Sequence, residues 1–332
     1  MVVDTVKQTW PPFVLVTGLL LIGVVAQADG LFAAVGGRIA RTRLGSVQLL
    51  LALLGLVAVV TAVLNLDTAV VFLTPVLVHA ARSRGIDEKP FLYGSVFMAN
   101  AGSTLLPGSN LTNLLVLAHE PIHGASFVSH TGLAWVVSCA LTAAIVAVAL
   151  PPRRAESEPL DVPPLALNAG VVATLGAAVL VLTLKNPAVP VLVIGVGACL
   201  LRRVRMSIDL RVPALLFVVA VGLGTLARAW LGPAHLLAGS SRWLTAVIAT
   251  GGSVVVNNLP AAVLFSAQRP PHPIALLLGL DIGPNLAVTG SLSAVLWWQA
   301  ARSVGARPSI LLYSAIGLIL VPVTLAAAIA VS

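Results

Sequence analysis

The sequence has little charge, few aromatic residues and almost no cysteine. Of its 332 residues, 9% are Asp, Glu, Lys or Arg and 5% are Phe, Trp or Tyr, while 58% are hydrophobic. A soluble globular domain carries about 25% charged residues. The two cysteines, Cys139 and Cys199, lie in apolar stretches and provide neither a disulfide framework nor metal-ligand spacing. The composition excludes a water-soluble enzyme and a collagenous or disordered chain.

What the chain has instead is a series of apolar segments. Because a membrane-crossing helix needs about 20 apolar residues, the longer ones predict an all-helical polytopic membrane protein. Residues 12–28 lack the short apolar region and cleavage site of a signal peptide, so we expect them to be a mature span. The apolar segments fall near 13–29, 44–64, 68–81, 91–118, 131–150, 165–184, 188–201, 212–231, 243–256, 260–267, 274–300 and 309–331.

Two apolar segments, 68–81 and 260–267, are too short to cross a bilayer, and each follows a polar break. We therefore expect two re-entrant hairpins, over 44–81 and 243–267, with these breaks at their tips. Every longer segment then crosses once, and both termini are expected to be extracytoplasmic. This arrangement puts fourteen of the 19 Lys and Arg residues on the cytoplasmic side, which agrees with the positive-inside rule.

The order of the segments repeats along the chain. A crossing, a hairpin, a long segment and another crossing occur in the first half and recur in the second, which starts from the opposite side of the membrane. Such an inverted repeat places the substrate site of a transporter near the bilayer midplane, between the two copies. We expect a first repeat, a linker with scaffold helices, and a second repeat: 1–150 (hairpin 44–81, broken helix 91–118), 151–211, and 212–332 (hairpin 243–267, broken helix 274–300).

Two acidic residues, Asp67 and Asp281, are expected at membrane depth, whereas the others lie in loops or near helix ends. A charged Asp at the bilayer centre costs about 2.5–3.5 kcal/mol on insertion scales, so such residues mark ion or substrate pathways. Burial favours the protonated carboxyl group, which suits binding of a coupling proton or cation. Two simpler roles stay open: Asp67 as the N-cap of the helix that follows it, and Asp281 as a partner for unwound backbone.

Pro and Gly interrupt two of the long apolar segments, at Pro107-Gly108 and at Gly283-Pro284. Each interruption frees backbone groups, which must face protein or a wet cavity at membrane depth. Half-helix N-termini favour an anion or an oxygen-rich solute there, and freed carbonyl groups favour a cation. Packing of small residues, with Asn bonding between helices, is the alternative explanation.

Other classes of function have little support in the sequence. The formal net charge is +8, but the basic residues are scattered over short loops, so no nucleic-acid partner is expected. His119, His123 and His130 share one outer loop with Glu120, which we interpret as a solvated loop rather than a metal site. No phosphate-binding loop or catalytic motif is present, so we expect no enzyme activity and no cofactor, and energy from an ion gradient or a partner.

Several motifs resemble the arsenical pump membrane protein family of the ion transporter superfamily, to which the divalent anion/sodium symporters are related. The resemblance covers most of the chain, and its most specific parts are Asn257-Asn258-Leu259-Pro260 and the run Gly283–Trp297. It implies an inner-membrane secondary transporter that exports arsenite or antimonite in exchange for protons, by an elevator-like motion of a transport domain against a scaffold. It further implies a homodimer, and the sequence leaves open whether an ATPase partner attaches.

The motif match also implies where substrate and ion bind. Asn65, Asp67 and Thr68 would form one hairpin tip, and Asn257 and Asn258 the other. The broken helices would contribute Asn100, Gly108, Ser109, Asn110, Asn285, Thr289, Gly290 and Ser291, to which the depth argument adds Asp281. Two other functions stay open: a divalent anion (dicarboxylate or sulfate) or sodium/proton transporter of the same superfamily, and a passive channel.

Overall fold

The computed structural model describes residues 2–118, 120, 122, 124–159, 161–164, 166–184, 186–204, 211–230 and 232–332. In this part of the chain the regular structure is helical, with sixteen α-helices, three short 3₁₀ helices (η) and no strand. The predicted all-helical class is therefore confirmed.

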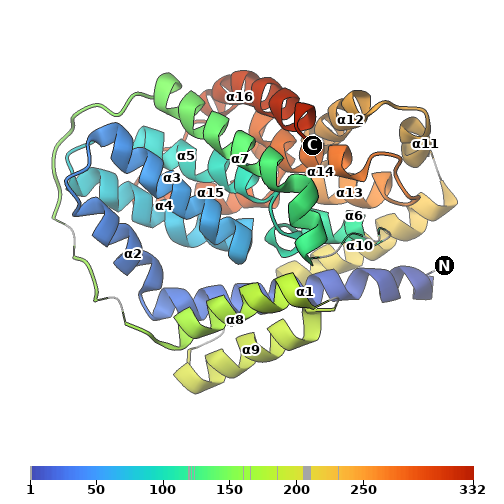
Figure 1. Cartoon of the computed structure of the whole chain (residues 1–332), viewed down its shortest axis with the longest axis horizontal. Helices are drawn as coiled ribbons and strands as arrows, with labels where there is room; N and C mark the ends of the chain where they lie inside the picture. Colours follow the sequence, from blue (N-terminus) through green and yellow to red (C-terminus); the bar gives the residue numbers. More distant parts are fainter. Residues whose placement is uncertain are drawn as a thin grey trace.

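The two halves contain the same order of elements: a long helix, a shorter one, a helical hairpin, a broken helix and a final long helix (Figure 1). The first half consists of α1 (Val2–Ala28), α2 (Leu31–Ala40), α3 (Ser46–Val63), α4 (Leu66–Ser83), α5 (Lys89–Gly102), η1 (Pro107–Ser109), α6 (Leu111–Leu117) and α7 (Gly124–Ala149). The second consists of α10 (Arg211–Ala229), α11 (Gly232–Ala238), α12 (Arg242–Val256), α13 (Asn258–Phe265), α14 (Pro273–Ile282), η2 (Gly283–Leu286), η3 (Val288–Gly290), α15 (Leu292–Ser303) and α16 (Ile310–Ala330). Between the halves lie α8 (Ala169–Thr183) and α9 (Ala188–Arg202).

The predicted breaks are present, but several helix lengths differ from the expectation. Neither α2 nor α11 was predicted, and α4 has 18 residues rather than the apolar stretch 68–81 alone. The reason is that an apolar run marks only the buried part of a helix. The helix α4 continues beyond its apolar run to the polar residues Asp67 and Arg82 at its ends. The helix α2 likewise has a polar residue, Arg38, in its last turn.

Helix length limits which elements can cross a membrane. Among the described residues, α1, α3, α7 and α16 are long and apolar enough, and the bent pair α10–α11 is a fifth if it counts as one span. One arm of the first predicted hairpin, α3, is therefore itself long enough to cross. The re-entrant course of α3–α4 remains a prediction, as do the division into repeats and the side on which the termini lie.

The helices α8 and α9 lie beside α1 along one edge of the molecule (Figure 1). A Cβ atom on Gly195 of α9 would lie 2.7 Å from the carbonyl oxygen of Gly18, so α1 and α9 cross with their backbones in contact. The hairpins α3–α4 and α12–α13 lie toward opposite ends of the long axis (Figure 1).

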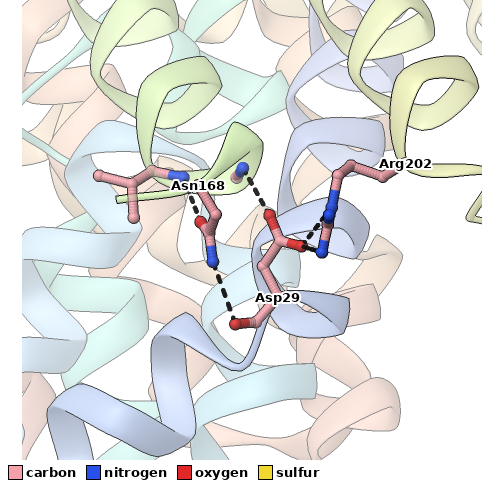
Figure 2. A network of polar contacts seen from close by, with 5 residues as sticks. Asp29, Asn168 and Arg202 are labelled. Atoms are coloured by element: carbon pink, nitrogen blue, oxygen red, sulfur yellow. Dashed lines mark hydrogen bonds and ion pairs between the residues drawn. The ribbon is translucent and has the colours of Figure 1, made fainter. Parts of the chain in front are cut away.

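A polar network fastens α1, α8 and α9 together at one end (Figure 2). The Asp29 carboxylate, next to the end of α1, accepts a hydrogen bond of 2.8 Å from the backbone N–H of Gly170 at the start of α8. It also pairs with Arg202, the last residue of α9, at 2.6 Å. Asn168 caps α8 and donates to the Asp29 carbonyl oxygen at 3.2 Å. The side chain of Asp29 is 1% exposed and that of Arg202 is 48% exposed, so this network is a clamp whose carboxylate is buried and whose guanidinium reaches solvent.

The linker after α7 is fixed to the turn between α4 and α5. The backbone N–H of Asp87 donates to Arg153, that of Ala155 to Gly85, and that of Glu158 to Arg82, at 2.7–3.0 Å. Gly85 has a φ of +60°, and a Cβ atom there would lie 2.9 Å from the Ala155 carbonyl oxygen. Glycine is therefore required where the linker approaches the turn.

Candidate transport site

An N-cap begins the second arm of each hairpin and of each broken helix. A capping side chain accepts a backbone N–H at the start of a helix, where intrahelical partners are missing. The capping residues are Asn65, Asn110, Asn257 and Ser291, which accept from Thr68, Thr112, Leu259 and Ala294 at 2.7, 3.1, 3.4 and 3.3 Å. Four of the predicted site residues thus hold the breaks in place, each at the positive end of a helix.

The two broken helices contact one another through buried polar side chains. Asn110, in the first break, donates from Nδ2 to Asp281 Oδ1 at 2.7 Å. Asn100, near the end of α5, donates from Nδ2 to Asn285 Oδ1 in the second break, also at 2.7 Å. All four residues are at most 4% exposed. Predicted site residues from the two halves are therefore brought together at one place.

The Asp281 carboxyl group keeps one oxygen without a hydrogen-bond partner in the described chain, as do two asparagines of the first broken helix. Its residue is 0% exposed, and its Oδ2 atom has no hydrogen-bond partner among the described residues. The Ser103 and Asn113 side chains lie near the same carboxyl group. Asn100 Oδ1 and Asn113 Oδ1 are likewise buried and unpartnered in the described part of the chain. Buried acceptors without a donor are rare, so these groups can take a proton, a cation or a hydroxylated solute.

Both hairpin tips bond to one short segment around the start of α15. Ser293 Oγ donates to Asp67 Oδ1 at 2.6 Å, and Asn257 Nδ2 donates to the Thr289 carbonyl oxygen at 3.0 Å. Asn257 has a φ of +76°, a region that L-residues rarely adopt and that is often found at functional sites. The segment from Thr289 to Ser293 therefore makes one hydrogen bond with each tip, donating to Asp67 and accepting from Asn257.

The simpler role considered for Asp67 is wrong, because Asn65 and not Asp67 accepts the backbone N–H at the start of α4. The Asp67 carboxylate is half-buried and faces α15 instead. Asn65 Nδ2 and Thr68 Oγ1 are buried and unpartnered within the described residues. The Asp281 carboxylate bonds to the Asn110 side chain rather than to unwound backbone.

The remaining predicted residues differ in their surroundings. Ser109 donates to the carbonyl oxygens of Ser103 and Leu106, which closes the first break. A Cβ atom on Gly108 would lie 3.3 Å from the Leu19 side chain, and one on Gly290 would lie 2.8 Å from Pro284 Cα. Asn258 is buried at the second tip. The Thr289 side chain is exposed, and Thr289 takes part through its carbonyl oxygen.

Close packing of α16 against the second break fixes the position of that break. Tyr313 of α16 donates from its hydroxyl group to the Pro284 carbonyl oxygen at 3.0 Å. One turn further along α16, a Cβ atom on Gly317 would lie only 2.0 Å from the Asn285 carbonyl oxygen. Only glycine fits at this contact, so α16 determines where Asn285 lies.

Ser103, Asn113, Ser293 and Tyr313 were missing from the predicted site. A weak signal existed for two of them, since Asn113 is one helical turn after Asn110, and Ser293 is two residues after the cap Ser291. Of the histidine loop, His119 and His123 lie outside the described residues, and His130 bonds to the Ser126 carbonyl oxygen at 2.6 Å. The described residues contain no group of three His, Cys, Asp or Glu side chains suited to a metal ion.

An arginine joins the base of each hairpin to the broken helix of the other half. Arg82, at the end of α4, donates to the carbonyl oxygen of Val304 after α15 at 2.9 Å and pairs with Glu88. Arg269, after α13, pairs with Glu120 after α6 at 3.1 Å. The Glu120 side chain is 2% exposed although Arg269 is 66% exposed. Each hairpin is therefore bonded at its base to the opposite broken helix. Near the tips, Asp67 bonds to Ser293 of the opposite half, whereas Asn257 bonds to Thr289 of its own half.

Comparison with known proteins agrees with this architecture. Residues 3–280 match the family model described as CitMHS, citrate transporter. The chain belongs to the citrate transporter family. It is 23% identical to the inner membrane protein YbiR of Escherichia coli over 87% of this chain and 82% of that protein. It is 26% identical to a 46 kDa membrane protein of Mycobacterium leprae over 89% of this chain and 79% of that protein.

A solved structure has the same fold. The YdaH transporter of Alcanivorax borkumensis, described as having an unusual topology, superposes with a TM-score of 0.60 over 99% of this chain and 86% of that chain, at 15% identity. As a member of the citrate transporter family, the chain is a multi-pass membrane protein and a secondary transporter of the ion transporter type. The likenesses do not specifically support the arsenical pump family. The family match ends at residue 280, directly before Asp281.

Proposed function

We propose that the chain exports a small uncharged, oxygen-rich solute, with arsenous acid or its antimony counterpart as first candidate, in exchange for protons across the inner membrane. One observation carries the proposal: two carboxyl groups, Asp67 and Asp281, stand among amide and hydroxyl groups, and no described Lys or Arg side chain bonds to either. Amide and hydroxyl groups can both donate to and accept from the hydroxyl groups of such a solute.

The absence of a bonded cation in the described site also affects how citrate, the substrate in the family's description, could bind. A citrate trianion would meet two carboxyl groups and no bonded cation in the described site, and like charges repel strongly in a low-dielectric surrounding. Citrate or another divalent anion would therefore have to enter with a cation or with both carboxyl groups protonated. Membership of the citrate transporter family favours this second candidate.

Proton exchange follows from the chemistry of a buried acid. A carboxyl group away from water binds a proton more readily than one in water. Protonated Asp281 can donate to a neighbouring oxygen, whereas its ionised form only accepts, so the two forms offer different sites to a hydroxylated solute. Alternate binding of proton and solute at one place gives exchange. Sodium in place of the proton is the alternative.

An elevator-type motion is the mechanism that we propose for alternating access. The moving unit would comprise α3–α6 and α12–α15, which the tip bonds and the two arginines hold together. The scaffold would comprise α1, α8, α9 and α10, of which the first three share the Asp29 clamp. A Cβ atom on Gly23 of α1 would lie 3.4 Å from the Phe72 ring of α4, so this contact has to break if the unit moves.

Flux assays in proteoliposomes test the substrate and the coupling. We expect arsenite flux driven by a pH gradient, and Asp67→Asn or Asp281→Asn to lower it about a hundredfold or more, the loss typical of a proton-transfer group. Asp87→Asn, in the α4–α5 turn, is the matched control and should transport normally. Citrate, succinate or sulfate flux that depends on sodium or magnesium would establish the second candidate. Flux that ignores both the pH gradient and Asp67→Asn would indicate a channel.

Cross-linking tests the motion in a background without Cys139 and Cys199. A mercury-bridged pair at Gly23→Cys and Phe72→Cys should stop transport, because it joins the scaffold to the moving unit. The control pair, Thr74→Cys and Ser95→Cys, replaces two hydroxyl groups that lie 2.9 Å apart within the moving unit and should leave transport unchanged. Equal inhibition by both pairs, or by neither, would contradict this division of the helices.

A further inference from the structure

A cavity of about 600 Å³ opens between the proposed scaffold and the first broken helix. Its volume falls within the range of about 300–1,000 Å³ that small-molecule sites occupy. The N-terminal half of α1 and the turn between α8 and α9 form one wall, and η1, α6 and the start of α7 form the other. Leu15, Pro107, Leu117 and Val181 make its lining predominantly apolar.

The rim of this cavity is amphipathic. Lys7 and Trp10 are three residues apart on α1, so they lie on the same face of the helix, and both are exposed. Lys7 has no acidic partner among the described residues. Asn186, between α8 and α9, adds an amide group to the same rim. A free ammonium and an amide therefore stand at the mouth of an otherwise apolar cavity.

These features match the chemistry of one kind of ligand in a membrane. Tryptophan rings concentrate at the level of the lipid headgroups, and a lysine near that level attracts anionic lipids. A soluble anion would gain nothing from contact with the apolar lining. A neutral lipid would form no ion pair with Lys7. Among the described lining residues, the combination of the Lys7 cation with an apolar cavity fits a molecule with a negative head and a hydrocarbon chain.

We propose that this cavity binds an anionic phospholipid, with one acyl chain along Leu15, Pro107 and Val181 and the phosphate on Lys7. The chain would lie between the scaffold and the break that carries Asn110, because Pro107 lies three residues before Asn110. Binding of this lipid does not depend on which solute is transported, so the proposal stands apart from the proposed function.

Native mass spectrometry of the detergent-purified full chain, titrated with phosphatidylglycerol or phosphatidylcholine, tests the site. We expect phosphatidylglycerol to bind about fivefold more tightly, the size of effect that one lysine near an anionic headgroup provides. Lys7→Gln should abolish this preference. Val181→Phe should weaken binding of both lipids, because Val181 lines the cavity and is 4% exposed.

Two variants serve as matched controls. Val179→Phe lies on the same helix, but its side chain is 56% exposed and lies outside the cavity lining, so lipid binding should not change. Lys89→Gln removes an exposed lysine at the start of α5 and should keep the preference for phosphatidylglycerol. Equal affinity for the two lipids, or an unchanged preference in Lys7→Gln, would overturn the proposal. So would a dimer that retains no lipid, since a second copy would then cover the cavity. If Val181→Phe does not fold, the Lys7 comparison decides alone.

Discussion

The Asn110 amide donates a hydrogen bond of 2.7 Å to the Asp281 carboxylate, although the two residues belong to different halves of the chain. Asn110 also caps α6. Its side-chain oxygen therefore accepts a bond within its own half, while its side-chain nitrogen donates a bond to the other half. The geometry of the first break and the environment of the buried acid are therefore set by the same residue.

Replacing Asn110 tests this double role. Asn110→Ala removes a cap, which is worth about 0.5–2 kcal/mol, and leaves a buried carboxylate oxygen unpaired, which costs about 1–3 kcal/mol. We expect a clear fall in the thermal unfolding temperature of the detergent-purified protein. Asn186→Ala, at an exposed amide without a bonded partner in the described chain, is the control. Equal unfolding temperatures for the two variants would show that the bond contributes nothing.

The contact between Gly317 and Asn285 predicts a position that tolerates no side chain. A methyl group at Gly317 would overlap the Asn285 carbonyl oxygen, and overpacking of this kind costs about 1–3 kcal/mol. Gly317→Ala should therefore lower both the unfolding temperature and transport. Gly55→Ala places the same methyl group on α3, where no atom lies within 4 Å, and should be neutral or slightly stabilising. Normal transport by Gly317→Ala would mean that α16 does not position the break.

The clamp at Asp29 predicts a stability effect far from the site. Asp29→Ala leaves the Gly170 N–H and Arg202 without their partner. Since Arg202 is 48% exposed and solvent screens part of the interaction, we expect a loss of about 1–3 kcal/mol in the free energy of unfolding. Asp161→Ala, in the exposed linker, should have no effect. Chemical denaturation followed by tryptophan fluorescence measures the free energies of unfolding. A loss in Asp161→Ala of similar size to that in Asp29→Ala would argue against the clamp.

The pair between Arg269 and Glu120 predicts a non-additive double mutant. Arg269→Gln leaves the buried Glu120 carboxylate without its cation and should destabilise the protein. Adding Glu120→Gln removes the uncompensated charge, so the double variant should regain much of the lost stability. Arg242→Gln, at an exposed arginine on α12, is the control. Additive effects in the double-mutant cycle would show that the two residues do not interact.

The sequence predicted the breaks because their causes are local. Pro107-Gly108, Gly283-Pro284 and the asparagines at both tips interrupt apolar runs, and all four breaks are present. The short helices α2 and α11 were not predicted, because with 10 and 7 residues each is much shorter than the apolar run of about 20 residues that predicts a crossing.

Partners across the halves could not be predicted from local patterns. No spacing rule connects Asp67 with Ser293 or Asn110 with Asp281, since these pairs depend on how the halves pack. Whether Asp67 caps a helix stayed open for a local reason, since Asn65, which does cap it, is also a favourable N-cap residue two positions earlier. The predicted site residues could be picked out one by one, because Asp and Asn are rare in an apolar chain.

The attachment of the linker to the α4–α5 turn has a consequence for how the chain can be divided. The first half binds residues 153–158 through three backbone hydrogen bonds of its own, before α8 begins. Val162 and Pro163 also lie against Gly37 and Gly30 of the first half. A cut between Pro164 and Leu167 would therefore leave each fragment with complete secondary structure and would keep these contacts within the first. We expect the two fragments, produced together in one cell, to assemble into an active split protein.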